Sequence, residues 1–182
     1  MSKYRNLGFK VKATSTAELE FVAEDICEIF TELGYMTDGR LDAERVLEDL
    51  FPKLGFNFAI RSKEELNSIA ACVYPDQQII VVREDIYDDL LRNDGRARFT
   101  IAHELAHVIL KHDLTLNRDS FAGNHQCFED TEWQANNLGA AILMPRSIVI
   151  KYFDDPYGLM NHCGCSYSSA LYRIKNVKKS SK

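Results

Sequence analysis

The sequence of 182 residues has no long apolar run, no internal repeat and no low-complexity linker. No stretch approaches the roughly 20 apolar residues that cross a bilayer, and residues 1–12 are basic and polar, unlike a signal peptide. Hydrophobic residues make up 46% of the chain and charged residues 27%, which is typical of a globular protein with a core. We therefore expect one cytoplasmic domain that does not associate with membranes.

The five cysteines are odd in number and irregularly spaced, which argues against a disulfide framework. The segment His162-Cys163-Gly164-Cys165, with Cys127 and His125, raises the alternative of a second metal site. It contains no C-x-x-C, so we expect free thiols instead. The net charge of −5 argues against direct nucleic-acid binding. The lysine-rich end, 175–182, is expected to be a frayed terminus.

The hydrophobic pattern predicts an α+β fold, with a small mixed or antiparallel sheet packed against two helices and further helices at both ends. Within the one domain we distinguish an N-terminal helical segment (1–52), a core (53–145) and a C-terminal helical segment (146–182). The unbroken apolar run 79–82 predicts a strand that is buried on both faces.

The individual elements follow from caps, breakers and periodicity. Leu19, Val22, Ile26, Ile29, Phe30 and Leu33 mark the apolar face of the first helix. The predicted elements are a helix over 15–33 with a Ser15/Glu18 capping box and a stop at Gly34, a short helix from Asp42 that ends by Pro52, strands over 56–60, 69–74 and 78–83, helices over 99–112 and 130–144, an irregular segment over 113–128, and one or two short helices in 146–182 with breaks at Gly158 and Gly164.

The strongest predicted helix carries an H-E-x-x-H sequence at 103–107. Residues i and i+4 differ by about 40° around a helix, so His103 and His107 can bind one zinc ion together. Glu104 is rotated by about 100° from His103, toward a water on the metal. The pattern predicts His103 and His107 as zinc ligands and Glu104 as the catalytic base.

A catalytic zinc ion usually has a third protein ligand. The extended motif H-E-x-x-H-x-x-G-x-x-H is excluded, because this chain has Leu110 and Asp113 at the positions of its glycine and third histidine. His112 lies about 140° further round the helix than His107, so we expect it to point away from the metal.

Glu132, on the helix over 130–144, is the better candidate for the third ligand. Asn136 lies on the same face one turn later and is predicted to hydrogen-bond a ligand imidazole. Glu129 and Asp130 remain close competitors, and His125 is a weaker alternative.

These residues resemble the ImmA/IrrE metallopeptidases. The resemblance covers about residues 55–177 and rests on the strings Arg98–His107, Glu132–Asn136 and Ala140–Pro145, with a similar stretch over Cys165–Ile174. It implies zinc on His103, His107 and Glu132, and Glu104 as base. Ala106 stands where many members have glycine. The first 50 residues match no family that we can name.

The resemblance also implies a function. Family members are typically bacterial or encoded by mobile elements, and they cleave or inactivate a partner helix-turn-helix repressor or antitoxin. We therefore expect a zinc endopeptidase with such a substrate; the alternative is a non-catalytic module that relieves repression by contact.

The peptide is expected to add as a strand to the edge of the sheet. Candidates for oxyanion stabilisation are Tyr152, Tyr157, His162 and Arg146. Core positions are predicted at Phe99, Trp133, Leu138 and Leu143, and the alternative for Trp133 is that it lines the cleft.

Overall fold

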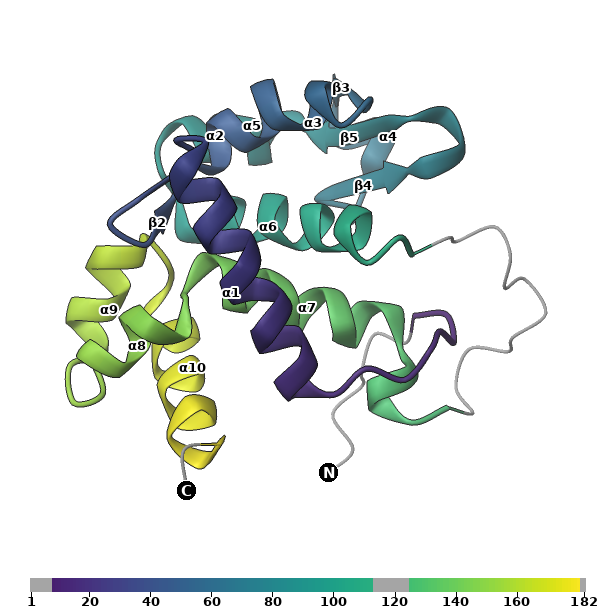
Figure 1. Cartoon of the computed structure of the whole chain (residues 1–182). Helices are drawn as coiled ribbons and strands as arrows, with labels where there is room; N and C mark the ends of the chain where they lie inside the picture. Colours follow the sequence, from purple (N-terminus) through teal and green to yellow (C-terminus); the bar gives the residue numbers. More distant parts are fainter. Residues whose placement is uncertain (1–7, 113–124, 181–182) are drawn as a thin grey trace.

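The computed structural model describes residues 8–112 and 125–180, and its centre is helix α6 (Gly95–Ile109). Figure 1 shows α6 between a three-stranded sheet and helix α7 (Thr131–Leu143), with other helices at both ends of the chain. The predicted α+β class is confirmed. Among the described residues, no helix has the length and apolar character needed to span a membrane.

The sheet has the order β3-β5-β4. Strand β5 (Ile79–Arg83) pairs in parallel with β3 (Asn57–Arg61) and antiparallel with β4 (Ala71–Tyr74), so the predicted hairpin is confirmed. A short 3-10 turn, η2 (Pro75–Gln77), joins its strands.

Burial on both faces of β5 was a wrong prediction. Ile80 and Val82 are fully buried, whereas Ile79 and Val81 are only half-buried. One face of the strand is therefore buried and the other stays partly open, and α5 (Glu84–Leu91) follows the strand directly. Strand β4, at the edge of the sheet, packs against α6.

Helix α1 (Thr16–Glu32) starts and ends where the sequence predicts. Ser15 and Glu18 form the capping box, and Gly34 follows the C-cap with a φ of 75°. The predicted apolar face is too broad, because Ile29 and Leu33 are 51% and 56% exposed. Leu19 and Phe30 are buried, and the helix packs across α7 (Figure 1).

The helix from Asp42 does not end by Pro52. It runs as α2 (Ala43–Arg45), a π-helical stretch η1 (Val46–Leu50) and α3 (Phe51–Lys53). Proline lacks an N–H and clashes with the carbonyl one turn earlier in a regular α-helix, and here a wider π turn directly precedes it. A two-residue hairpin, β1 (Met36–Thr37) and β2 (Arg40–Leu41), connects α1 to this segment.

The C-terminal segment contains three helices, α8 (Arg146–Lys151), α9 (Pro156–Cys163) and α10 (Tyr167–Ser180). Gly164 ends α9 in a left-handed conformation, but Gly158 lies inside that helix and is not a break. The prediction of a frayed lysine-rich end is wrong as far as Ser180, because α10 continues to that residue and buries Val177. Residues 113–124 of the predicted irregular segment, and Lys182, lie outside the described residues.

Two buried arginines fasten the outer helices to the centre. Arg98 of α6 donates hydrogen bonds to the carbonyls of Leu41, Cys163 and Gly164. Arg173 of α10 binds the Glu20 carboxylate and the carbonyl of Met144. Since a buried guanidinium must satisfy its donors, these contacts fix the positions of α9 and α10.

Candidate metal centre

Helix α6 is longer at its N-terminus than predicted. Asp94 caps it by accepting hydrogen bonds from the N–H groups of Arg96 and Ala97, so the helix begins at Gly95 instead of residue 99. It ends at Ile109, and Lys111 then adopts a left-handed conformation with a φ of 50°. This early end redirects the chain just after the H-E-x-x-H sequence.

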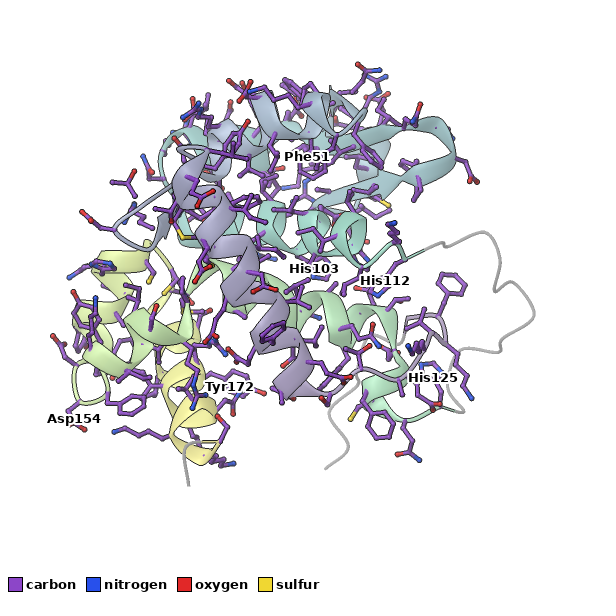
Figure 2. The ribbon with its side chains drawn as sticks, viewed as in Figure 1. Phe51, His103, His112, His125, Asp154 and Tyr172 are labelled. Atoms are coloured by element: carbon purple, nitrogen blue, oxygen red, sulfur yellow. The ribbon has the colours of Figure 1, made fainter. Side chains whose placement is uncertain are left out.

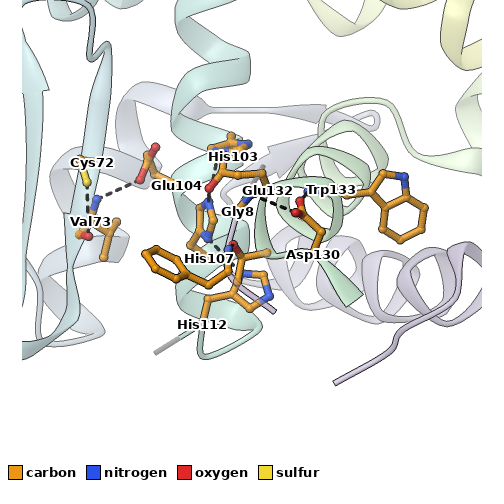
Figure 3. Close-up of polar contacts among 12 residues, drawn as sticks. Gly8, Cys72, Val73, His103, Glu104, His107, His112, Asp130, Glu132 and Trp133 are labelled. Carbon is orange, nitrogen blue, oxygen red and sulfur yellow. Dashed lines mark hydrogen bonds and ion pairs between the residues drawn. The ribbon is translucent and has the colours of Figure 1, made fainter. Parts of the chain in front are cut away.

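Three side chains from the two central helices converge on one point. The Nε2 atoms of His103 and His107 are 3.1 Å apart. The Glu132 carboxylate lies 3.4 Å from the first and 3.3 Å from the second through its two oxygens (Figure 3). A tetrahedral zinc ion bound at 2.0–2.1 Å separates its ligand atoms by about 3.3 Å. The three donor atoms therefore fit zinc, and among the described residues they form the one such group.

The close approach of the two helices brings Glu132 to the histidines. At Gly139 of α7, an added Cβ would lie 3.0–3.1 Å from the Ala102 carbonyl and the His103 Cα. The absence of a side chain lets the helices pack with their backbones nearly in contact. The close imidazoles of His103 and, next, His107 lower the pKa of Glu132 strongly, so this side chain is a carboxylate.

His112 does not point away from the site, contrary to prediction. Its Nδ1 lies 2.9 Å from Nδ1 of His107, and its Nε2 lies 3.1 Å from Oε1 of Gln134. The prediction assumed that the helix continues through 112. Because α6 ends at Ile109 and Lys111 turns back, His112 returns to the three converging side chains, which we call the metal group (His103, His107 and Glu132). No pattern in the sequence marks this turn.

These contacts determine which nitrogen of His107 carries the proton. The Gln134 amide donates from Nε2 to the carbonyls of Lys12 and Phe128, each at 2.8 Å, so its oxygen faces His112. Burial lowers the pKa of His112 to about 4, and a neutral ring that donates from Nε2 must accept at Nδ1. His107 therefore donates from Nδ1 and presents a bare Nε2 lone pair to the site, as a metal ligand requires.

Glu104 lies beside this group without joining it. Its Oε2 accepts a hydrogen bond of 2.9 Å from the backbone N–H of Val73 on β4 (Figure 3). Only 7% of Glu104 is exposed, and this burial raises the pKa of its carboxyl. A cavity of about 550 Å³ opens over the two histidines, Glu104 and Glu132. The carboxyl of Glu104, with its raised pKa, therefore lies at the edge of the same cavity as the three candidate metal ligands.

Comparison with known proteins identifies the family. Residues 75–175 match the family model Peptidase_M78, described as the IrrE N-terminal-like domain. The chain belongs to this family. A search of curated proteins found no match.

Among solved structures, a Mycobacterium tuberculosis transcriptional regulator matches with a TM-score of 0.58 and 20% identity. The match covers 86% of this chain and 46% of that one, so the chain spans about half of the regulator's length. The likeness supports the fold.

In this member of the IrrE-like family, the predicted contact from Asn136 to a ligand imidazole stays a prediction. Burial opposes protonation of His103, but the Glu132 carboxylate, Glu104 and, most weakly, the Asn136 side chain favour it, and together they raise the pKa of His103. Nδ1 of His103 is buried and makes no hydrogen bond to any residue that the structure describes.

The competing ligands lie elsewhere. Asp130 is fully buried, caps α7 through the Trp133 N–H, and accepts from His125 Nε2 at 2.8 Å and from the Gly8 N–H at 2.9 Å. Glu129 faces Lys10 at 3.5 Å. These side chains hold the N-terminal segment against the start of α7, so of the three acids proposed as the third ligand only Glu132 lines the cavity.

The cysteines do not assemble with histidine into a second group. Cys163 and Cys165 are buried beside Arg98, whereas Cys127 is exposed in η3 (Cys127–Glu129), at the other end of the molecule. All five cysteines are free thiols, as expected.

The proposed oxyanion residues are also remote. Tyr152 contacts His162 at 3.2 Å, Tyr157 packs against Tyr167, and Arg146 binds Ser180. None of the four candidates lines the cavity at the metal group. Their positions in sequence, just after α7, carried no information on how α8 and α9 fold away from the cavity.

The predicted core is correct for Leu138 and Leu143, which are fully buried, but not for Phe99 and Trp133. Both aromatic rings are only partly buried and line a second cavity next to the first.

Proposed function

We propose that this protein is a cytoplasmic zinc-dependent endopeptidase that cleaves a partner helix-turn-helix repressor or antitoxin. The observation that carries the catalytic part is the convergence of His103, His107 and Glu132 beside the buried carboxylate of Glu104. The regulatory part draws on the IrrE-like family and on the likeness in fold to a transcriptional regulator.

Glu104 is suited to move a proton. When bound, zinc makes a water molecule more acidic and polarises a carbonyl group. The carboxylate of Glu104 accepts the proton from the attacking water and returns it to the leaving amine. Its raised pKa favours this exchange, because a base works best when its pKa approaches the pH of the reaction.

Strand β4 suits the binding of an extended peptide. It forms the edge of the sheet, and the N–H of Val73 points away from β5 and toward Glu104. A peptide that pairs with this edge would run past Glu104 at the mouth of the cavity. Asn136, which also lines the cavity, offers an amide that can hydrogen-bond the peptide.

The first test is metal content. Wild-type protein purified without added metal should contain about one zinc ion per chain, and Glu132→Ala should contain much less, since two histidines alone bind zinc weakly. A wild type that neither contains zinc nor takes it up would overturn the proposal.

The second test separates catalysis from contact. Glu104→Gln should keep zinc, because the residue is not a ligand, and should lose activity by about 10²–10⁴-fold. Cleavage is followed by mass spectrometry of new N-termini after incubation with helix-turn-helix regulators of the same organism. If Glu104→Gln relieves repression as well as wild type does, the protein acts by binding alone.

A further inference from the structure

A second cavity, of about 760 Å³, lies between α1, α7 and α10. Its apolar lining consists of Phe99, Trp133, Ala140 and Met144, together with the ring of Tyr172. Tyr172 is 69% exposed on α10 (Figure 2). An aromatic side chain that stays this open beside a cavity has surface available for a ligand.

This cavity adjoins the one at the metal group, because the two share lining residues. Phe99 and Asn136 line both. The Phe99 ring centroid is 6.3 Å from that of His103, one helical turn away. Trp133 directly follows Glu132, and its indole points away from the metal group (Figure 3). A chain segment held at the metal centre can therefore extend into the second cavity.

Of the three charged side chains that line the second cavity, Arg173 and Glu20 are already matched with each other, and the third is Lys179 near the end of α10. Arg173 binds Glu20 with both terminal nitrogens and donates to the Met144 carbonyl at 3.1 Å, so neither charged group needs a ligand. The remaining polar groups include the amides of Asn137 and Asn176. A cavity with an apolar floor and a few amides binds apolar groups and orients their backbone.

We propose that the second cavity is a specificity pocket, which binds large apolar side chains of the substrate next to the bond that is cleaved. The inference rests on the proposed peptidase function, and it names the substrate as a flexible segment of a partner protein that carries such residues. Its volume falls in the range of roughly 300–1,000 Å³ that is typical of ligand sites, so it has room for more than one side chain.

The single tryptophan of the chain makes the cavity directly observable. Since that residue is Trp133, a ligand in the cavity should change the tryptophan fluorescence of the protein. The probe is acetyl-Leu-Phe-Leu-amide, with acetyl-Ser-Asn-Ser-amide as the polar comparison. Both are titrated into Glu104→Gln, which does not cleave them. We expect a saturable change with the apolar peptide and none with the polar one.

Two variants and a control locate the effect. Ala140→Phe fills the cavity and should weaken the apolar peptide at least tenfold. Tyr172→Ala removes an exposed ring at little cost in stability and should weaken it several-fold. Leu171→Ala, on the same helix but outside the cavity lining, should leave the titration unchanged.

The outcome is independent of the proposed catalysis. The second cavity contains no metal ligand, so the titration is repeated on zinc-free protein with the same expected result. No saturable change with the apolar peptide, or an equal change in Ala140→Phe, Tyr172→Ala and wild type, would overturn the pocket. Binding of the apolar peptide, with no cleavage of helix-turn-helix regulators by zinc-loaded wild type, would instead overturn the peptidase and keep the pocket.

Discussion

Two imidazoles can bind one metal ion only if each presents an unprotonated nitrogen to it. For His107 this condition is met by a chain of contacts that runs from the Lys12 carbonyl through Gln134 and His112. His112 would thus affect a bound metal ion only through His107. Its contribution is to accept the hydrogen bond from Nδ1 of His107 and so leave Nε2 of His107 unprotonated.

Replacing His112 should therefore weaken metal binding while leaving the ligands in place. We expect His112→Ala to lower zinc affinity by about 10–100-fold, the usual cost of losing such a partner. The measurement is a competition titration against a chromogenic chelator. His162→Ala is the control, because this ring contacts Tyr152 and the Asp38 carbonyl away from the cavity. Equal zinc affinities for the two variants would contradict the role of His112.

For single residues, the sequence predicts the relations that lie within one helix. The spacing of His103 and His107 follows from helix geometry alone, and Glu104 comes with it. The contact of Val73 with Glu104 joins residues 31 apart in the sequence, so it depends on the packing of β4 against α6. His112 was misplaced because a single left-handed residue decides its direction.

Among the elements, the contact between α6 and α7 decides whether Glu132 reaches the histidines. Gly139→Ala should push these helices apart by inserting a methyl group against the Ala102 carbonyl. Overpacking costs about 1–3 kcal/mol, and the better helix propensity of alanine returns up to about 1 kcal/mol. We expect a net loss of about 1–2 kcal/mol in urea denaturation and weaker zinc binding. A gain in stability would mean that helix propensity dominates and that the contact is not tight.

A second prediction concerns the hydrogen bonds by which Arg98 of α6 binds the end of α9. Arg98 uses its planar group to bind three carbonyls, and a lysine ammonium cannot match that geometry. Arg98→Lys should therefore lower the free energy of unfolding by about 2–3 kcal/mol, since hydrogen bonds from charged groups are strong. Arg92→Lys is the control: Arg92 is exposed and pairs with Asp89, so its change should stay within about 0.5 kcal/mol. If both variants lost a similar free energy of unfolding, the three hydrogen bonds from Arg98 to backbone carbonyls would contribute little to stability.

Breakers were an uneven guide to the elements, because Gly34 and Gly164 follow helix ends as predicted whereas Pro52 and Gly158 lie inside helical segments. Pro52 lies within a continuous helical segment directly after a π turn, and Gly158 lies in the first turn of α9, which begins at Pro156. Caps were reliable: Ser15, Asp42 and Asp130 each start a helix. A cap satisfies backbone donors through a local hydrogen bond, whereas the effect of a breaker depends on what packs around it.

In the whole molecule, the site draws on segments outside the residues that match the family. The match spans 75–175, yet the carbonyl that orients Gln134 belongs to Lys12 and the N–H that holds Glu104 belongs to Val73. Residues 9–14 pair with the stretch before α7 through backbone hydrogen bonds. The N-terminal segment, which no sequence motif linked to the site, is thus part of its support.

Because the metal ligands come from two helices, a bound ion should also stabilise the whole fold. Zinc at about 100 times its dissociation constant adds about 2.7 kcal/mol, or about 5–10 °C in melting temperature for a chain of this size. The imidazoles must be neutral to bind, and the pKa of His103 is raised, so this protection should be larger at pH 7.5 than at pH 5.5. Thermal scans with zinc and with chelator at pH 7.5 and 5.5 measure the difference. Glu132→Ala should show little zinc-dependent shift at either pH, and an undiminished shift in that variant would exclude Glu132 as a ligand of the stabilising ion.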